Sequence, residues 1–595
     1  MHGASFDEVA HLTAGTSYVA YQDFRFQPEN GLLPQAWAGL PVALSGHLPV
    51  DAGPAWAGAD VWAAGRELLG CPDGPALLAR GRGMIVLFLL ATLALVWRMS
   101  RRLFGPIGGL LSLALGALSP TMLAHGAVVT SDVCAAGFFL GTTWVCWELA
   151  HKVTMKRALG AGAAVTGLLL SKASGVLIAP IAAVLIAVRF ARGEADRPAR
   201  LVGAASLVGL LAWGGLWAAY GFRYSTFSAE HSEEPPEHLM PLPGLLEDVG
   251  AVEAPLRLAL DHHLLPEAWL YGFAHVMANS AGRSASLRGE YRTTGWWWFF
   301  PYAFAIKTPL TLLALLALGL VGARAAPPGE RAPWFALLGV YGAATFTTNL
   351  NIGHRHLLPM LPPLFVLSGG LATLLRGRGR LAIPALLAAL LVEVVASWPH
   401  YLSYMNPLAG PDRWRHLVDS SLDWGQEGPL LAKELERLRG PDEPVHLAWF
   451  GSMDPRSYGI EAEALPSFLP WAPPGAPLPL RPGLYAVSAT QLQGVYTGSP
   501  PPWTGDDEAA YQRALLDWRR WIGSGDEARA ELLAERPLED WVRTLKAFDR
   551  LRFERLSAWL RREGRPVGRA GHAVFIYRLS REDLTVALGG PAPLP

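Results

Sequence analysis

Two adjacent acids and a histidine near the start of the chain have the composition of an acid–base or cation-binding motif. Asp7, Glu8 and His11 lie together in Phe6-Asp7-Glu8-Val9-Ala10-His11. A carboxylate beside a histidine can deprotonate a hydroxyl group or hold a cation. Adjacent acids near a chain start are also common on solvated surfaces, so this motif alone leaves both roles open.

A third acid, Asp132, stands at the mouth of an apolar segment and follows His125 and Ser131. An ionised carboxylate at membrane depth costs free energy unless it is paired or functional. The alternative is a helix N-cap, in which Ser131 or Asp132 accepts hydrogen bonds from the next turn. Both interpretations stay open at this point.

Three candidate phosphate-binding side chains follow later in the chain. Lys307 sits some ten residues into an apolar stretch, and His354 and Arg355 occupy a short turn between two apolar segments. Basic and titratable groups in such places favour an anionic ligand such as a phosphate. Snorkelling of Lys307 towards the interface and contact of the turn with lipid head groups are the alternatives.

A fifth motif is polar and aromatic. The stretch 401–407, which contains Tyr404, leads into 419–426, which contains Asp423. Tyrosine and carboxylate side chains would suit contacts with a sugar, and a linker that folds onto the membrane surface would explain the same composition. Tyr404 and Asp423 are therefore candidate substrate-binding residues.

The composition indicates what kind of protein must position these groups. Of the 595 residues, 51% are hydrophobic and 17% are charged, whereas soluble globular proteins carry about 25% charged residues. The chain therefore belongs among membrane proteins. Its 50 basic and 50 acidic residues leave no overall basic field for nucleic acid, and its three cysteines imply neither a disulfide framework nor a zinc site.

Apolar runs long enough to cross a bilayer, about 20 residues each, predict some ten spans. Every second connection between them is rich in Lys or Arg, which places these connections in the cytoplasm and the chemical motifs outside. The expected spans are 84–98, 106–122, 133–150, 158–171, 174–190, 201–220, 297–320, 333–349, 357–375 and 381–398.

Three regions follow from this pattern. We expect a first extracytoplasmic loop with interfacial helices over 1–83, a transmembrane domain over 84–399 with a large outer loop at 221–296, and an extracytoplasmic α/β domain over 400–595. Strand-like runs at 445–450 and 573–577 alternate there with helix-like stretches at 507–522 and 538–562.

Five motifs occur in an order that resembles a known enzyme family. They are Phe6-Asp7-Glu8 with His11, Ala124-His125 to Asp132, Lys307-Thr308-Pro309, Asn351 to His356, and Asp423-Trp424-Gly425-Gln426. Together they resemble the bacterial phospholipid-carrier-dependent glycosyltransferases, which are relatives of the protein O-mannosyltransferases and the lipid A aminoarabinose transferases. The fold that this resemblance implies is the C-type glycosyltransferase fold, a polytopic α-helical membrane protein.

The resemblance also implies a reaction. The expected donor is a polyprenyl-phosphate-linked sugar and the expected acceptor is a hydroxyl group on a protein, lipid or glycan, with inversion at the anomeric carbon. Asp7 maps onto the family's base and Asp132 onto an orienting partner, and Glu8 is a further catalytic candidate. A divalent cation, Mg²⁺ or Mn²⁺, is compatible with Asp7, Glu8 and Asp132, although three acids from two loops are not a diagnostic ligand set.

Two features depart from the family pattern. Pro28-Glu29 continues as Asn30-Gly31 where relatives commonly have His-Pro-Pro-Leu, which puts donor contacts of that segment in doubt. The family also has a spanning helix before its Asp-Glu loop, so we expect an apolar segment to be encoded upstream of the present start.

Two other functional classes remain as alternatives. A catalytically silent relative that serves as a scaffold would fit the Asn30-Gly31 departure, and a transporter or flippase would fit many spans with intramembrane charges. Transporters often show internal repeats with charges near the midplane, and neither is apparent here. The sequence identifies neither the sugar nor the acceptor.

Overall fold

The computed structural model describes residues 2–228, 241–280, 282–472, 478, 480–497 and 500–594. The chain forms two compact units. One contains Asp7–Arg283 and Thr294–Leu408, and the other contains Met1–Phe6, Ser284–Thr293 and Ala409–Pro595. We call them the helical unit and the C-terminal unit.

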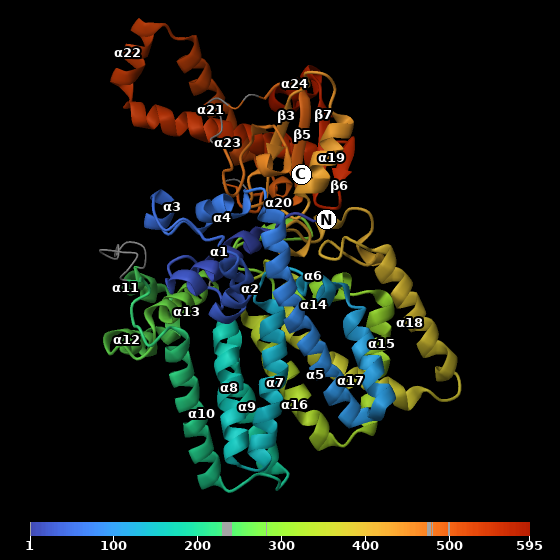
Figure 1. The fold of residues 1–595 in the computed structure, drawn as a ribbon. Coiled ribbons are helices and arrows are strands. Elements are labelled where there is room, and N and C mark those ends of the chain that lie inside the picture. Colours follow the sequence, from blue (N-terminus) through green and yellow to red (C-terminus); the bar gives the residue numbers. More distant parts are fainter. Residues whose placement is uncertain are drawn as a thin grey trace. The chain divides into compact units, whose positions relative to one another are not determined.

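Long apolar helices dominate the helical unit (Figure 1). In the described part of the chain, six helical segments are long and apolar enough to cross a membrane, or seven if the bent pair α14–α15 is one span. The six are α5 (Gly74–Ala117), α7 (Asp132–His151), η1–α9 (Ala173–Leu177 and Ile178–Ala191), α10 (Pro198–Ala219), η6–α17–η7 (His354–Met360, Leu361–Ser368 and Gly369–Leu374) and α18 (Gly379–Ala396).

Helices also form at the other predicted spans. These are α8 (Met155–Ser171), the pair α14 (Phe299–Lys307) and α15 (Leu310–Gly322), which bends by 110°, and α16 (Pro328–Thr347). The span expected at 84–98 and most of the span expected at 106–122 fall within α5, which is broken at Gly105, where φ is 75°. The last residues of the second span belong to the turn before α6 and to its start. The number of spans and the domain boundaries stay predictions.

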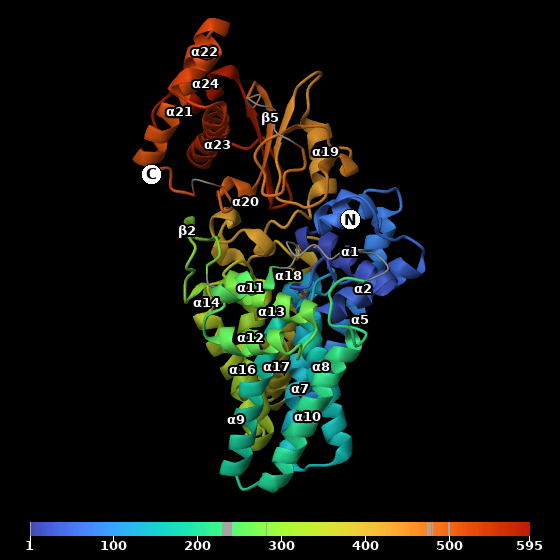
Figure 2. The same cartoon turned by 90° about the vertical axis from the view of Figure 1, so that its left-hand side faces the viewer.

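These helices pack side by side. Figures 1 and 2 show α7, α8, α9 and α10 running next to one another, and α8 packs against both α7 and α10. Small residues allow close approach, because a Cβ on Gly322 would lie 2.1 Å from the carbonyl oxygen of Gly370. Large apolar side chains such as Leu210 and Val392 are exposed on the helix surfaces, as expected where lipid replaces water.

Shorter helices precede and interrupt the long ones. The first loop forms α1 (Phe6–Tyr21), α2 (Leu32–Leu44), α3 (Pro54–Ala57) and α4 (Val61–Leu69), and α6 (Pro120–His125) precedes α7. The described part of the long outer loop forms α11 (Leu242–Leu245), α12 (Glu253–Asp261) and α13 (Glu267–Ser280). Residues 229–240 of that predicted loop lie outside the described residues.

The C-terminal unit is an α/β domain. Its sheet has the strand order β4-β3-β5-β7-β6, with β3 parallel to β4 and β5, and β7 antiparallel to β5 and β6. The strands are β3 (Val445–Ala448), β4 (Glu463–Ala464), β5 (Gly483–Ser488), β6 (Gly568–Ala570) and β7 (Val574–Leu579). Every residue of β5 is buried, as expected of a central strand.

Helices complete this unit, chiefly α19 (Gly428–Leu438), α21 (Gly505–Gly523), α22 (Asp526–Glu535), α23 (Leu538–Arg562) and α24 (Arg581–Gly589). The two strand-like runs and both helix-like stretches expected from the sequence are therefore present. The predicted fold class, a polytopic α-helical membrane protein with a C-terminal α/β domain, is confirmed.

The crossing of α1 over α2 provides a test of the packing that positions the first motif. A Cβ on Gly15 would lie 1.9 Å from the carbonyl oxygen of Gln35, a distance at which backbone must move. We expect Gly15→Ala to destabilise the protein by about 1–3 kcal/mol, the usual cost of overpacking, and to lower the melting temperature in detergent micelles.

Gly83→Ala is the matched control, because a Cβ on this α5 glycine meets nothing within 4 Å. Replacing glycine in a helix interior removes chain entropy from the unfolded state, so this variant should be neutral or more stable by up to ~1 kcal/mol. Equal melting temperatures for the two variants would contradict the close crossing.

Candidate functional site

Helix α1 presents its three candidate side chains in different surroundings. Asp7 and His11 are four residues apart and therefore share a face of the helix, whereas Glu8 points elsewhere. The Asp7 side chain is 20% exposed, and that of Glu8 is fully buried. Of the adjacent pair, Asp7 is thus the acid that solvent can reach.

A chain of alternating charges connects α1 with three other helix ends. The Asp7 carboxylate accepts a hydrogen bond from Arg355 at 2.7 Å, and Arg355 lies 3.7 Å from Asp132. Asp132 in turn accepts a hydrogen bond from Lys172 at 2.5 Å. We call Asp7, Arg355, Asp132 and Lys172 the charge chain.

The backbone explains how these four residues meet. Asp132 is the first residue of α7, and Arg355 lies in the first turn of η6. Lys172 occupies the break between α8 and η1, where its backbone is extended with φ −163° and ψ 146°. Each side chain therefore comes from a helix terminus or a break.

Lys172 is a residue that the sequence motifs missed. Its side chain is 19% exposed while that of Asp132 is 1% exposed, so Lys172 neutralises a buried carboxylate and also faces the solvent side. A lysine in the break between two apolar helices was the available signal, since an ammonium group in such a place needs an anionic partner.

Glu8 has a different role from Asp7 in this structure. Both of its carboxylate oxygens accept hydrogen bonds from Arg82 on α5, at 2.8 and 2.6 Å, and one also accepts from the backbone N–H of Val129 at 2.9 Å. This bidentate pair fixes α1 against α5 and against the turn that leads to Asp132.

The predicted histidines and Lys307 surround the charge chain. His125 interacts electrostatically with Asp132, Arg355 and Lys307, and His354 with Lys307 and His125. Burial lowers the pKa of His125 to about 3 and lowers that of His11, so both are neutral hydrogen-bonding groups at physiological pH. Lys307 donates to the carbonyl oxygen of Leu402 at 2.6 Å.

Tyr404 and Asp423, the two residues expected to contact a sugar, have hydrogen-bond partners outside the charge chain. The Tyr404 hydroxyl donates to Glu393 on α18, which also accepts from Thr311 at 3.0 Å. Asp423 belongs to the C-terminal unit, where it accepts from the backbone N–H of Thr490 at 2.8 Å and burial raises its pKa to about 7. Contacts of either residue with a sugar stay predictions.

Glu29 is a second residue that the motifs did not single out. Burial, with Asp7 nearby, raises the pKa of Glu29 to about 7. The side chain lines a narrow cavity whose walls include Tyr220, Trp269 and Phe273. A carboxyl group that titrates near neutral pH is thus held close to the expected base.

The Asn30-Gly31 departure has a structural explanation. A Cβ on Gly31 would lie 1.8 Å from the carbonyl oxygen of Ser171. Only glycine therefore allows this segment to lie against the residue that precedes Lys172. The departure brings the Glu29 segment next to the charge chain.

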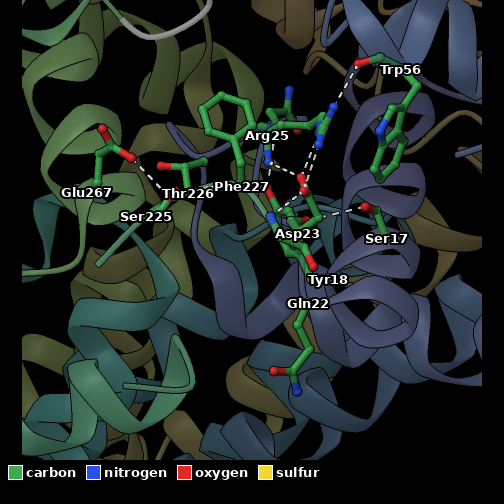
Figure 3. Close-up of polar contacts among 12 residues, drawn as sticks. Ser17, Tyr18, Gln22, Asp23, Arg25, Trp56, Ser225, Thr226, Phe227 and Glu267 are labelled. Carbon is green, nitrogen blue, oxygen red and sulfur yellow. Dashed lines mark hydrogen bonds and ion pairs between the residues drawn. The ribbon is translucent and has the colours of Figure 1, made fainter. Parts of the chain in front are cut away.

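A buried ion pair holds the preceding segment in place (Figure 3). The Asp23 carboxylate accepts two hydrogen bonds from the Arg25 side chain, both at 2.8 Å, and one from the backbone N–H of Ser228 at 2.8 Å. Arg25 also stacks 4.1 Å from the Trp56 ring and donates to the Trp56 carbonyl oxygen.

The polar contacts around Asp23 continue into the outer loop, where the backbone N–H of Thr226 donates to Glu267 of α13 at 2.9 Å (Figure 3). The first loop and the stem of the long outer loop are therefore joined through buried polar contacts. Such a network fixes the start of the Gln27–Gly31 segment.

The three acids do not fit a divalent cation. Each carboxylate is paired with a different cationic side chain, Asp7 with Arg355, Glu8 with Arg82 and Asp132 with Lys172. A metal site needs several oxygen ligands directed at one point, and these oxygens are directed at arginine and lysine.

Comparison with known proteins supports the class that the helices and the site suggest. Residues 80–214 match the family model described as dolichyl-phosphate-mannose-protein mannosyltransferase. This segment is less than a quarter of the chain, but it includes Arg82, His125, Asp132 and Lys172. A search of curated protein sequences finds no match.

Solved structures give distant matches. The apo structure of ArnT from Cupriavidus metallidurans is 12% identical, with a TM-score of 0.30 and coverage of 84% of this chain and 91% of that one. ArnT bound to undecaprenyl phosphate gives 12% identity, a TM-score of 0.31 and coverage of 82% and 89%. The apo oligosaccharyltransferase of Archaeoglobus fulgidus gives 15% identity, a TM-score of 0.38 and coverage of 74% and 55%.

The chain has the apolar helices of a multi-pass membrane protein. Residues 80–214 are similar to the dolichyl-phosphate-mannose-protein mannosyltransferases. The resemblance first inferred from five ordered motifs is confirmed.

Replacement of Arg82, the ion-pair partner of Glu8, should show how much this pair contributes to the stability of the fold. Arg82→Met leaves a buried carboxylate without its bidentate cation, which typically costs about 3–5 kcal/mol. We expect a large drop in melting temperature in detergent micelles. Arg80→Met removes an exposed arginine from the same helix and should leave the melting temperature unchanged. Similar losses in both variants would contradict a structural role for the Glu8–Arg82 pair.

The raised pKa of Glu29 predicts a pH-dependent stability. The unfolded chain loses this proton near pH 4.5 and the folded chain near pH 7, so the stabilisation is complete below about pH 4.5 and is lost as the pH rises to about 7. Glu29→Gln lacks this titration. Relative to the wild type, its free energy of unfolding should therefore rise by about 3 kcal/mol across that window.

Thermal unfolding of both proteins at several pH values checks this prediction. Asp423 also titrates in the window, but it is present in both proteins and cancels in the difference. A stability difference that is independent of pH would show that Glu29 is ionised in the folded protein.

Proposed function

We propose that this protein is an inverting glycosyltransferase that moves a monosaccharide from a polyprenyl-phosphate carrier to an acceptor hydroxyl group. The charge chain is the observation that carries the proposal, because it places a solvent-accessible carboxylate beside fixed cations at the ends of apolar helices. The acceptor belongs to a protein, a lipid or a glycan.

Asp7 is the base in this mechanism. The acceptor oxygen forms a bond with the anomeric carbon, the bond from that carbon to the phosphate oxygen breaks, and Asp7 takes the hydroxyl proton. Asp7 is 20% exposed, whereas Asp132 is 1% exposed and Glu8 is fully buried. Accessibility favours Asp7 over the other two acids, which act as positioning residues.

The cations stabilise the departing phosphate. Lys172, Arg355 and Lys307 outnumber the two carboxylates of the charge chain, which leaves excess positive charge for an anion. Preorganised cations and hydrogen-bond donors aimed at developing charge lower the barrier without reorganisation. The neutral His125 and His11 add hydrogen-bonding capacity without adding charge. Because the leaving phosphate is already an anion, no proton donor is required.

The distribution of basic connections supports one side of the membrane for the reaction. The basic connections 98–102, 152–157 and 376–380 join the helix ends opposite to those that supply Asp132, Lys172 and Arg355. The positive-inside rule favours a cytoplasmic location for the basic ends. The proposed reaction therefore takes place on the extracytoplasmic face of the cell membrane.

Transfer of radiolabelled sugar from synthetic polyprenyl-phosphate sugars, measured in membrane vesicles, tests the proposal. We expect Asp7→Asn to reduce turnover by about 10²- to 10⁴-fold, the usual contribution of a general base. Glu67→Gln is the matched control, since it makes the same acid-to-amide change at an exposed position of α4.

Four other results would each contradict one part of the proposal. Equal activity of wild type and Asp7→Asn would overturn the assignment of the base. No transfer from any donor by well-expressed wild type would favour the silent scaffold, and sugar-lipid flux into vesicles that survives Asp7→Asn would favour a transporter. Inhibition by a chelator, reversed by Mg²⁺ or Mn²⁺, would contradict the cation-paired site.

A further inference from the structure

A cavity beside the middle of α5, just before the break at Gly105, is not used by the proposed reaction. It has a volume of about 410 Å³, within the range of small-molecule sites. Three arginines and two tryptophans contribute to its wall, together with apolar side chains, and they come from α5 and α7: Leu95, Trp97, Arg98, Arg101, Arg102 and Trp144.

We propose that this cavity binds the phosphate head group of an anionic phospholipid, with an acyl chain lying along α5. Basic pockets between transmembrane helices are suited to such head groups, because several guanidinium groups can hold one phosphate. The proposed site contains no residue of the charge chain and does not depend on the transfer reaction.

The three arginines differ in what they already contact. Arg102 lies 3.4 Å from Glu148 and stacks 4.5 Å from the Trp144 ring, so its charge is already paired although its side chain is 52% exposed. Arg98 and Arg101 are exposed, and within the described ranges neither has a carboxylate at ion-pair distance. Arg101 stacks 5.2 Å from Trp97. Two guanidinium groups therefore remain for an anion.

The apolar surface beside the cavity distinguishes a phospholipid from a small inorganic anion. Leu95 lines the cavity itself. Leu87, eleven residues before Arg98 and thus on nearly the same face of α5, is 49% exposed, and Leu90 is 56% exposed. This surface offers an acyl chain a path directly below the head-group site, which free phosphate would not use.

The helix break after these arginines reverses the direction of the chain. Gly105, with φ 75°, ends the first half of α5, and a residue with a side chain is rarely accommodated at such a φ. The second half folds back on the first, since a Cβ on Gly109 would lie 2.8 Å from the Cβ of Arg101. Arg98 and Arg101 remain exposed beside this hairpin.

Native mass spectrometry of the purified protein, titrated with phosphatidylglycerol, tests this site. We expect the double variant Arg98→Gln/Arg101→Gln to weaken binding at least tenfold. Arg376→Gln/Arg378→Gln removes the same charge from an exposed connection that does not line the cavity, and it should change binding less than twofold.

Three results would overturn the proposal. Equal weakening of phosphatidylglycerol binding by the control variant would show that the lipid is attracted to any basic surface of the protein. Equal binding of phosphatidylcholine would show that anionic charge is not recognised. Displacement of the lipid by millimolar inorganic phosphate would show a site for free phosphate and not for a phospholipid.

A second measurement uses the wild type alone and so does not depend on the folding of a variant. Photoactivatable phosphatidylglycerol should crosslink to residues 87–102 and to the α7 segment around Trp144. Crosslinks confined to other helices would overturn the proposal.

Discussion

A buried carboxylate at the end of an apolar helix is the constraint on which the arrangement of the candidate site depends. Asp132 is almost inaccessible to solvent, and an ionised acid in that position is tolerable only if cations compensate for its lost hydration. Lys172 and Arg355 supply the compensation from two other segments. The ends of α7, α8 and η6 must therefore meet. In this arrangement Arg355 contacts both Asp132 and Asp7.

This requirement explains why the helices around the site are interrupted. A continuous helix from α8 into α9 would bury the backbone of Lys172 in helical hydrogen bonds and direct its side chain along the helix surface. The extended conformation of Lys172 releases the side chain towards Asp132. The interruption also exposes the carbonyl oxygen of Ser171, against which the backbone of Gly31 packs. Breaks that weaken helices locally thus create the positions from which charged groups converge.

The sequence predicts the components of the site better than their pairings. Asp7, Asp132 and Arg355 were recognisable because ordered motifs surround them, and the apolar periodicity located the helices that carry them. The partner of a buried charge was not recognisable, because Lys172 and Asp132 are 40 positions apart and Arg355 and Asp7 are 348 positions apart. Glu8 shows the same limit, since the sequence does not reveal that its carboxylate is paired with Arg82.

Asn30 and Gly31 illustrate how a departure from a family pattern can be structural. From the sequence alone, the loss of His-Pro-Pro-Leu weakens the expectation of donor contacts and favours a silent relative. In the structure, glycine is the residue that permits the approach to Ser171, and proline at that position would add atoms where a Cβ already has no room. The neighbouring Glu29 is held near Asp7 with a pKa raised to about 7. The close packing of Gly31 on Ser171 gives the departure a structural cause, so the departure by itself is not an argument for a silent relative.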